Sequence, residues 1–134
     1  MGAKQKGKTG EAEACEWLGK YLFEGNVRPE PNNKQVHIGC DIIVPPFIVE
    51  VKRRETLSLD QWWIQICKVD RHLLKMDREF IPVVMFRQNR RDWEFLISAN
   101  TIGCKIGYVR LKSNRFLEWA KRYRFNQSLY ESEG

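Results

Sequence analysis

The chain of 134 residues carries a formal net charge of +6 and is 43% hydrophobic. This size and hydrophobic content predict a single domain, residues 1–134, with its own core, and the positive charge favours an anionic partner such as nucleic acid or a membrane surface. No apolar run approaches the roughly 18 residues of a membrane span and no apolar segment follows the basic start, so we expect a cytoplasmic protein that does not enter a membrane.

The four cysteines are widely scattered along the chain: Cys15, Cys40, Cys67 and Cys104. No Cys-x-x-Cys pair occurs, and the chain has only two histidines. We therefore expect buried, reduced thiols rather than a zinc site.

The first 25 residues predict a basic, mobile N-terminus followed by a helix. Residues 1–8 are rich in lysine and glycine, Thr9 is a candidate N-cap, and Gly25 is a typical helix end. Apolar side chains recur at helical spacing between these ends: Ala14, Trp17, Leu18, Tyr21 and Leu22. Glu13 and Glu16 are expected to be surface residues, since acidic side chains suit the N-terminal half of a helix.

Two apolar strands, residues 41–44 and 47–52, form the most informative stretch of the sequence. A short strand over residues 26–30 and a polar loop to Gly39 are predicted before them. The dipeptide Pro45-Pro46 joins the two apolar strands. Prolines fit a primed two-residue turn badly, so we expect a connection longer than two residues.

The register of this hairpin brings charged side chains together. With Val44 opposite Phe47, Asp41 faces Glu50 across the pair, and Lys52 shares the face of Glu50 because side chains two apart on a strand point the same way. Two opposed carboxylates repel each other, and a divalent cation such as Mg²⁺ or Mn²⁺ would offset that repulsion. The alternative interpretation is that all three are solvated residues at strand ends.

Ser58-Leu59-Asp60-Gln61 predicts the start of a second helix by its capping-box pattern. The predicted buried face of this helix consists of Trp62, Ile66, Val69, Leu73 and Met76.

The remaining sequence predicts strands over residues 81–86 and 93–98, joined by the loop 87–92, then a short strand over residues 108–111 and a helix capped by Ser113. The predicted fold class is α/β, a single domain with one mixed sheet and helices on its faces.

The pattern Asp41 followed by Glu50-x-Lys52 resembles the PD-(D/E)XK nuclease superfamily, although Cys40 stands where the name-giving proline would be. The resemblance covers residues 6–98 and implies a restriction-endonuclease-like nuclease core. Residues 99–134 would be a C-terminal strand and helix extension that matches no motif.

The resemblance also implies roles for the individual residues. Asp41 and Glu50 would hold Mg²⁺, for which Mn²⁺ could substitute, and the backbone carbonyl of Val51 could be a further ligand. Lys52 would orient the water that attacks a phosphodiester.

A basic Gly-x-x-x-Glu start, Gly7 to Glu11, resembles archaeal-type Holliday junction resolvases, in which that glutamate joins the metal site. The same resemblance assigns Arg28 to a strand and Lys34 to a loop that meets DNA, whereas His37 is interpreted as incidental. The Ser58-x-x-Gln61 pattern resembles the glutamine motif of the virus-type replication-repair nucleases, in which the glutamine lies near the metal, but helix capping explains Gln61 almost as well.

These observations predict a Mg²⁺-dependent endodeoxyribonuclease that acts on branched DNA as a homodimer, in DNA recombination or repair, whether a host or a phage encodes it. The expected DNA-binding residues are Lys6, Lys8, Arg28, Lys34, Arg53, Arg54, Arg87, Arg90 and Arg91. The alternatives are a replication-repair or restriction-type nuclease that cuts flaps, ends or duplex DNA, a non-catalytic DNA-binding module on the same fold, and an RNA-binding protein.

Overall fold

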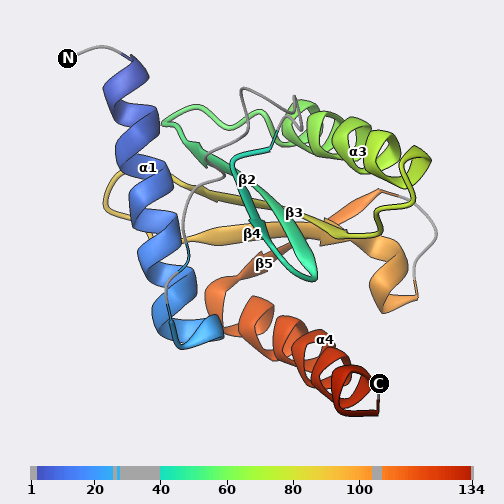
Figure 1. The fold of residues 1–134 in the computed structure, drawn as a ribbon. Coiled ribbons are helices and arrows are strands. Elements are labelled where there is room, and N and C mark those ends of the chain that lie inside the picture. The colour runs from blue at the N-terminus through green and yellow to red at the C-terminus, as the bar shows by residue number, and fades with distance from the viewer. Residues whose placement is uncertain (1–2, 26, 28–39, 104–106, 134) are drawn as a thin grey trace.

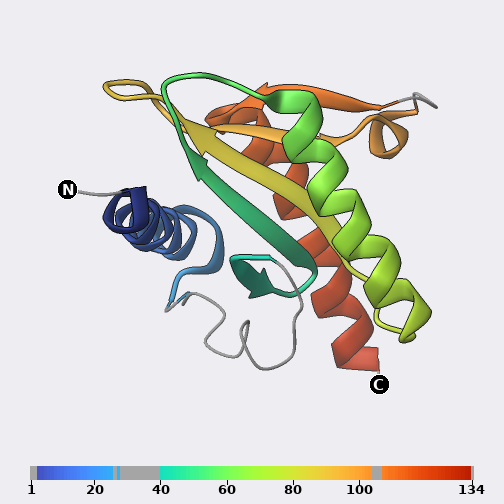
Figure 2. The same cartoon turned by 90° about the horizontal axis from the view of Figure 1, so that it is seen from above.

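A five-stranded mixed sheet with helices on both faces forms the domain (Figures 1 and 2). The computed structural model describes residues 3–25, 27, 40–103 and 107–133. The strands are β1 (Ile42–Val44), β2 (Phe47–Arg53), β3 (Ile81–Arg87), β4 (Glu94–Ser98) and β5 (Tyr108–Lys112), and they lie in the sheet in this order. The helices are α1 (Ala3–Leu18), which continues as a π-helical segment (Gly19–Phe23), α3 (Leu59–Lys75), a 3-10 segment (Ala99–Ile102) and α4 (Ser113–Glu133).

Two apolar clusters hold these layers together, one on each face of the sheet. On the α1/α4 face, Phe47, Val49 and Val51 of β2 pack with buried residues of α1 and α4. On the α3 face, Ile48 packs with Trp62 and other buried residues of α3. Because side chains alternate along a strand, the polar residues that follow Ile48 on its own face are directed toward the α3 side. The predicted mixed sheet between helices is therefore confirmed.

The β1–β2 hairpin has the predicted register. Val44 pairs with Phe47 and Ile43 pairs with Ile48. The expectation of a longer connection is wrong, because only Pro45 and Pro46 separate the strands. The peptide bond between these prolines is cis, and a cis proline at the third position of a turn gives a type VI turn, which lets two prolines close a two-residue connection.

The strand β2 also pairs with β3, and this pairing is parallel. The crossover between the two strands contains α3, as parallel neighbours require. Arg53 and Arg87 are aligned at the carboxyl ends of these two strands.

Several predicted helix features are corrected by the structure. The first helix begins at Ala3 rather than at Thr9, since Ala-Lys-Gln-Lys is itself a run of good helix formers. Ser58 is the N-cap of α3, but its side chain makes no capping hydrogen bond, so the reciprocal bonding of a capping box is absent at this described helix start. Met76 is 55% exposed and is the C-cap of α3, which ends at Lys75.

Other predictions are confirmed. Trp62, Ile66 and Leu73 are buried, and the final strand and the helix start at Ser113 lie where expected. The predicted strand over residues 26–30 falls almost entirely outside the described residues. None of the helices in the described ranges is both long enough and apolar enough to cross a membrane.

Candidate functional site

Asp41 and Glu50 come together at the open edge of the β1–β2 hairpin. Asp41 directly precedes β1, and its backbone N–H donates to the Val49 carbonyl (3.1 Å). Its Oδ2 accepts a hydrogen bond from the backbone N–H of Val51 (2.8 Å). This second bond fixes the Asp41 carboxyl beside β2, close enough to Glu50 to raise the pKa of that carboxyl.

Glu50 is a largely buried carboxyl whose proton is held unusually tightly. Its pKa is raised to about 8, mainly by burial and also by the negative charge of Asp41, while the ammonium of Lys52 acts in the opposite direction. The Lys52 Nζ lies 3.3 Å from Oε1 of Glu50, as expected for side chains two apart on one strand. The predicted grouping of Asp41, Glu50 and Lys52 is therefore present in the fold.

The Val51 carbonyl is directed to the same edge as the Asp41 carboxyl. In a strand, the N–H and C=O of one residue point to the same side, and the Val51 N–H points to Asp41. Strand β1 begins only at Ile42, so the sheet pairing of β1 and β2 covers residues up to Val49. The Val51 carbonyl is consequently directed to the same edge of β2 as its N–H, and its predicted ligand role stays a prediction.

Glu11 of α1 and Asp41 both act on the buried thiol of Cys15. Its pKa is raised to about 11, mainly by burial and also by the charges of Glu11 and Asp41. Gly10 lets α1 lie close to β2, since a Cβ at that position would stand 3.3 Å from the Cβ of Arg53. Within the described residues, however, no three His, Cys, Asp or Glu side chains form a group that could hold a metal ion.

Glu13 is the polar residue that sequence reasoning missed, because it was expected to lie on the surface. Its Oε1 lies 2.9 Å from Arg53 and its Oε2 lies 3.3 Å from Arg87. One carboxylate of α1 thus links the carboxyl ends of β2 and β3. The sequence does contain a signal for this role of Glu13. Residues three and four apart share a helix face, so Glu13 lies on the face that carries Gly10 and Trp17.

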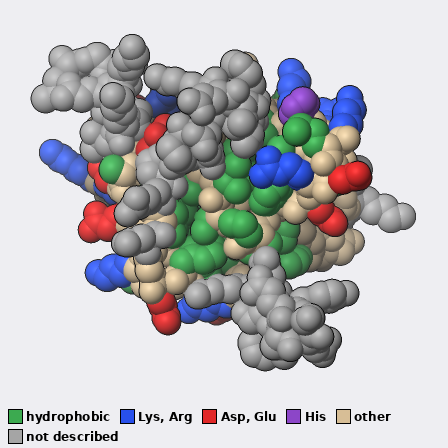
Figure 3. Space-filling model, viewed as in Figure 1, with side chains coloured by type: hydrophobic (Ala, Val, Ile, Leu, Met, Phe, Trp, Pro, Cys, Tyr) green, Lys and Arg blue, Asp and Glu red, His purple; other side chains and the backbone are tan. Residues whose placement is uncertain are grey.

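The predicted DNA-binding arginines divide into two groups. Arg53 and Arg87 are partly buried and engaged by Glu13, whereas Arg54, Arg90 and Arg91 are exposed. The predicted residues whose side chains lie outside the described part of the chain are Lys6, Lys8, Arg28, Lys34 and His37. In the view of Figure 3, described Lys and Arg side chains lie mainly around the edge of a face whose centre is hydrophobic.

Gln61 is exposed in the first turn of α3 and lines a shallow hollow with Tyr108 of β5. Asp60 accepts a hydrogen bond from the Tyr108 hydroxyl, which ties this end of α3 to the β5 edge of the sheet. Asp41 lies at the opposite, β1 edge. The structure therefore does not place Gln61 with the carboxyl pair, and its catalytic role stays a prediction.

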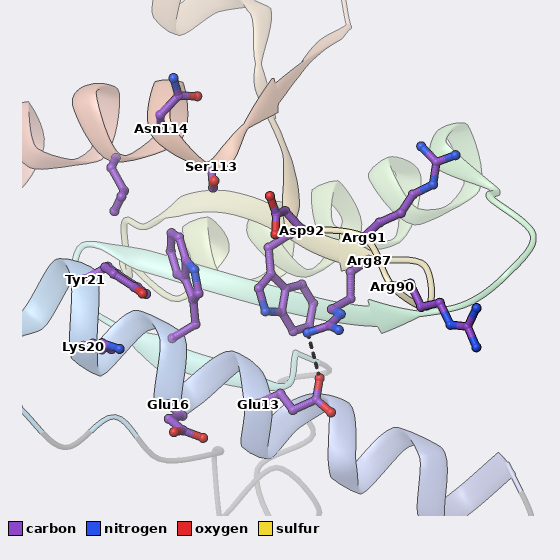
Figure 4. Close-up of a pocket in the computed structure, with 13 residues that line it drawn as sticks. Glu13, Glu16, Lys20, Tyr21, Arg87, Arg90, Arg91, Asp92, Ser113 and Asn114 are labelled. Atoms are coloured by element: carbon purple, nitrogen blue, oxygen red, sulfur yellow. Dashed lines mark ion pairs between the residues drawn. The ribbon is translucent and has the colours of Figure 1, made fainter.

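A second hollow, the α1–α4 groove, lies between α1, the β3–β4 turn and the start of α4 (Figure 4). Its volume is about 690 Å³. The residues that line it are Glu13, Glu16, Trp17, Lys20, Tyr21, Arg87, Arg90, Arg91, Asp92, Trp93, Ser113, Asn114 and Leu117. No pattern in the sequence predicts this groove.

Comparisons with known protein families, curated proteins and solved structures found no match to this chain.

Proposed function

We propose that this protein is a Mg²⁺-dependent endodeoxyribonuclease of the PD-(D/E)XK type. The observation that carries the proposal is the closeness of the Asp41 and Glu50 carboxyls, with the Lys52 Nζ 3.3 Å from Oε1 of Glu50. A protein gains no stability from two carboxyls held against each other, one of them with its pKa raised to about 8. Such an arrangement suits a site that exchanges a proton for a cation.

The donor set fits a hard divalent cation. Carboxylate oxygens and a backbone carbonyl are ligands that Mg²⁺ accepts, and Asp41, Glu50 and the Val51 carbonyl supply them. When bound, the metal would lower the pKa of a coordinated water and stabilise the charge of the leaving group. Lys52 would orient the attacking water through its ammonium, and Glu11 would support the site from α1.

We further propose that the substrate is branched DNA and that the protein acts as a homodimer. The net charge of +6 and the exposed arginines of the β3–β4 turn suit a polyanion. A junction resolvase cuts two strands symmetrically, which calls for a two-fold pair of sites. Comparing cleavage of a four-way junction with cleavage of its component duplex distinguishes this activity from replication-repair or restriction-type cutting.

The test of the proposal is the variant Lys52→Ala, assayed for DNA cleavage with Mg²⁺ and with EDTA. We expect the variant to lose cleavage and to keep DNA binding, because it lacks the water-orienting group while both carboxyls remain. Lys68→Ala, which removes an exposed lysine from α3, is the matched control and should cleave normally. Cleavage by Lys52→Ala within a few-fold of wild type would contradict the assignment.

A non-catalytic DNA-binding module is the second candidate function. It is favoured by one observation, that the described residues contain two close carboxyls but no group of three potential metal ligands. Under this alternative the wild-type protein binds DNA and leaves it intact at any Mg²⁺ concentration, which the same assay detects.

A further inference from the structure

We propose that the α1–α4 groove binds an unpaired DNA strand, stacking a base on Tyr21 while the arginines of the β3–β4 turn contact the phosphates. The identity of the ligand as DNA rests on the proposed function. The groove itself is separate from the carboxyl pair, since it lies on the α1/α4 face, whereas Glu50 and Lys52 follow Ile48 on the α3 face.

An exposed aromatic ring is the first observation that supports this proposal. Tyr21 is 45% exposed, although Tyr is a side chain that normally gains from burial. Its ring lies 5.2 Å from that of Trp17, which in turn lies 5.2 Å from the buried ring of Phe95. The exposed ring is therefore backed by a cluster of tilted aromatic rings and offers a base a preorganised surface.

Cations beside this ring are the second observation. The Lys20 Nζ lies 5.2 Å from the centre of the Tyr21 ring, and Arg90 and Arg91 extend from the β3–β4 turn at the other end of the groove (Figure 4). Neither arginine has an ion-pair partner among the side chains that the structure describes. Four basic side chains and three carboxylates line the groove, and Glu13 is already engaged by two arginines.

The size of the groove is the third observation. A volume of about 690 Å³ is far larger than a single ion requires. A smaller hollow of about 470 Å³ continues the α1–α4 groove past the β3–β4 turn to Lys112. The groove and this smaller hollow share Ser113 and Asn114 at the start of α4. The N-terminus of a helix adds a favourable field for phosphate, so the two hollows form a track for a strand.

The stacking surface also selects for an unpaired strand. Bases inside a duplex are covered on both faces by their neighbours, so only an unpaired base can lie flat on Tyr21. The groove therefore favours branched DNA that carries unpaired nucleotides over plain duplex.

The experiment measures the affinity of the full chain for a fluorescent oligothymidine by anisotropy, in EDTA, where no cleavage can occur. We expect Tyr21→Ala to weaken binding at least about fivefold, the lower end of the usual effect of removing one stacked base. Tyr21→Phe keeps the ring and should bind as wild type does. Ile64→Ala, which removes an exposed apolar side chain from α3 on the other face, should also bind as wild type does.

Two further binding measurements distinguish the contribution of base stacking from that of charge. Wild type should bind an abasic oligomer of the same length more weakly than oligothymidine, and Tyr21→Ala should lose this preference. Arg91→Ala should weaken binding of both oligomers, whereas Arg71→Ala, an exposed arginine on α3, should weaken neither by more than about twofold. Thermal melts of each variant confirm that it is folded.

The proposal is overturned if wild type does not bind the oligomer, if it binds the abasic oligomer equally well, or if Tyr21→Ala binds as Ile64→Ala does. Its failure is distinguishable from failure of the proposed function. If the protein cleaves DNA with Mg²⁺ but Tyr21→Ala binds as wild type does, only the groove proposal fails. If the protein never cleaves DNA but Tyr21→Ala weakens binding, only the nuclease assignment fails.

Discussion

Glu50 makes the stability of the folded protein depend on pH. Its folded pKa of about 8 lies above the ordinary value of 4.5, so between these values the folded state keeps a proton that the unfolded state has released. The folded state is therefore destabilised as pH rises through this range, by an amount on the order of a few kcal/mol at full effect. Desolvation of the carboxyl is the main cause.

The variant Glu50→Gln tests this dependence, since an amide cannot release the proton. We expect its free energy of unfolding in EDTA to exceed that of wild type near pH 8.5 and to approach it near pH 5. Glu94→Gln is a control of opposite sign, because the bonds from Arg110 to Glu94 (2.8 Å) lower the pKa of that carboxyl. Urea unfolding of the three proteins at both pH values measures their free energies of unfolding. If the free energy of unfolding changed equally with pH in Glu50→Gln and in wild type, the predicted titration of Glu50 would be excluded.

Asp41 offers a second prediction, about the repulsion within the pair. Asp41→Asn removes one charge and keeps an oxygen that can accept the Val51 N–H, so we expect it to be inactive yet at least as stable as metal-free wild type. Its melting temperature should respond much less to millimolar Mg²⁺. Asp41→Ala should be less stable by about 1–3 kcal/mol, because the Val51 N–H loses its acceptor.

Thermal melts with EDTA and with Mg²⁺ distinguish these outcomes. If Asp41→Asn melted clearly below wild type in EDTA, Asp41 would be a stabilising residue of the fold and not a metal ligand.

At the scale of elements, α1 is tied to the sheet by packing and by one polar link. Gly10 brings the helix close to β2, and Glu13 reaches Arg53 and Arg87 at the ends of two parallel strands. The Nε atoms of both arginines are buried without a hydrogen-bond partner among the described residues, and Arg53 also donates from Nη2 to the Asn89 side chain (3.3 Å). This link fixes the end of α1 that carries Glu11.

Glu13→Ala should therefore destabilise the fold by about 1–2 kcal/mol, because it leaves two partly buried guanidinium groups without their carboxylate. Glu16→Ala removes an exposed glutamate of the same helix and should change the free energy of unfolding by less than about 0.5 kcal/mol. Chemical denaturation measures both. Equal effects of the two substitutions would show that the link contributes nothing to stability.

At the scale of the whole molecule, the positive charge should make DNA binding strongly dependent on salt. Each phosphate contact on duplex DNA releases about 0.9 counterions, so several contacts give a log–log slope of affinity against salt steeper than about −3. Arg54, Arg90 and Arg91 are exposed and suited to such contacts, whereas Arg53 and Arg87 are held by Glu13. Anisotropy titrations across a range of salt provide the slope, and a flat response would contradict a phosphate interface.

The sequence by itself determined the local parts of the candidate site. The position of the prolines fixed the hairpin register, with Val44 opposite Phe47, and the period of two along a strand placed Lys52 beside Glu50. The described pairing ends at Ile42 and Val49, and Asp41, whose N–H donates to the Val49 carbonyl, lies just beyond it. The helical spacing of apolar residues located most of the buried face of α3, with Met76 as the exception. These features depend on residues near one another in the chain, where pattern and structure are directly linked.

Only the tertiary structure decided the contacts between distant segments. Glu13 and Arg53 are 40 residues apart, and their pairing exists because α1 packs across β2. The α1–α4 groove likewise forms because α1, the β3–β4 turn and α4 meet on one face of the sheet. Hydrophobic residues that repeat every two or every 3.6 positions specify which side of a strand or helix is buried. They do not specify which other element covers that side, because apolar burial is non-directional.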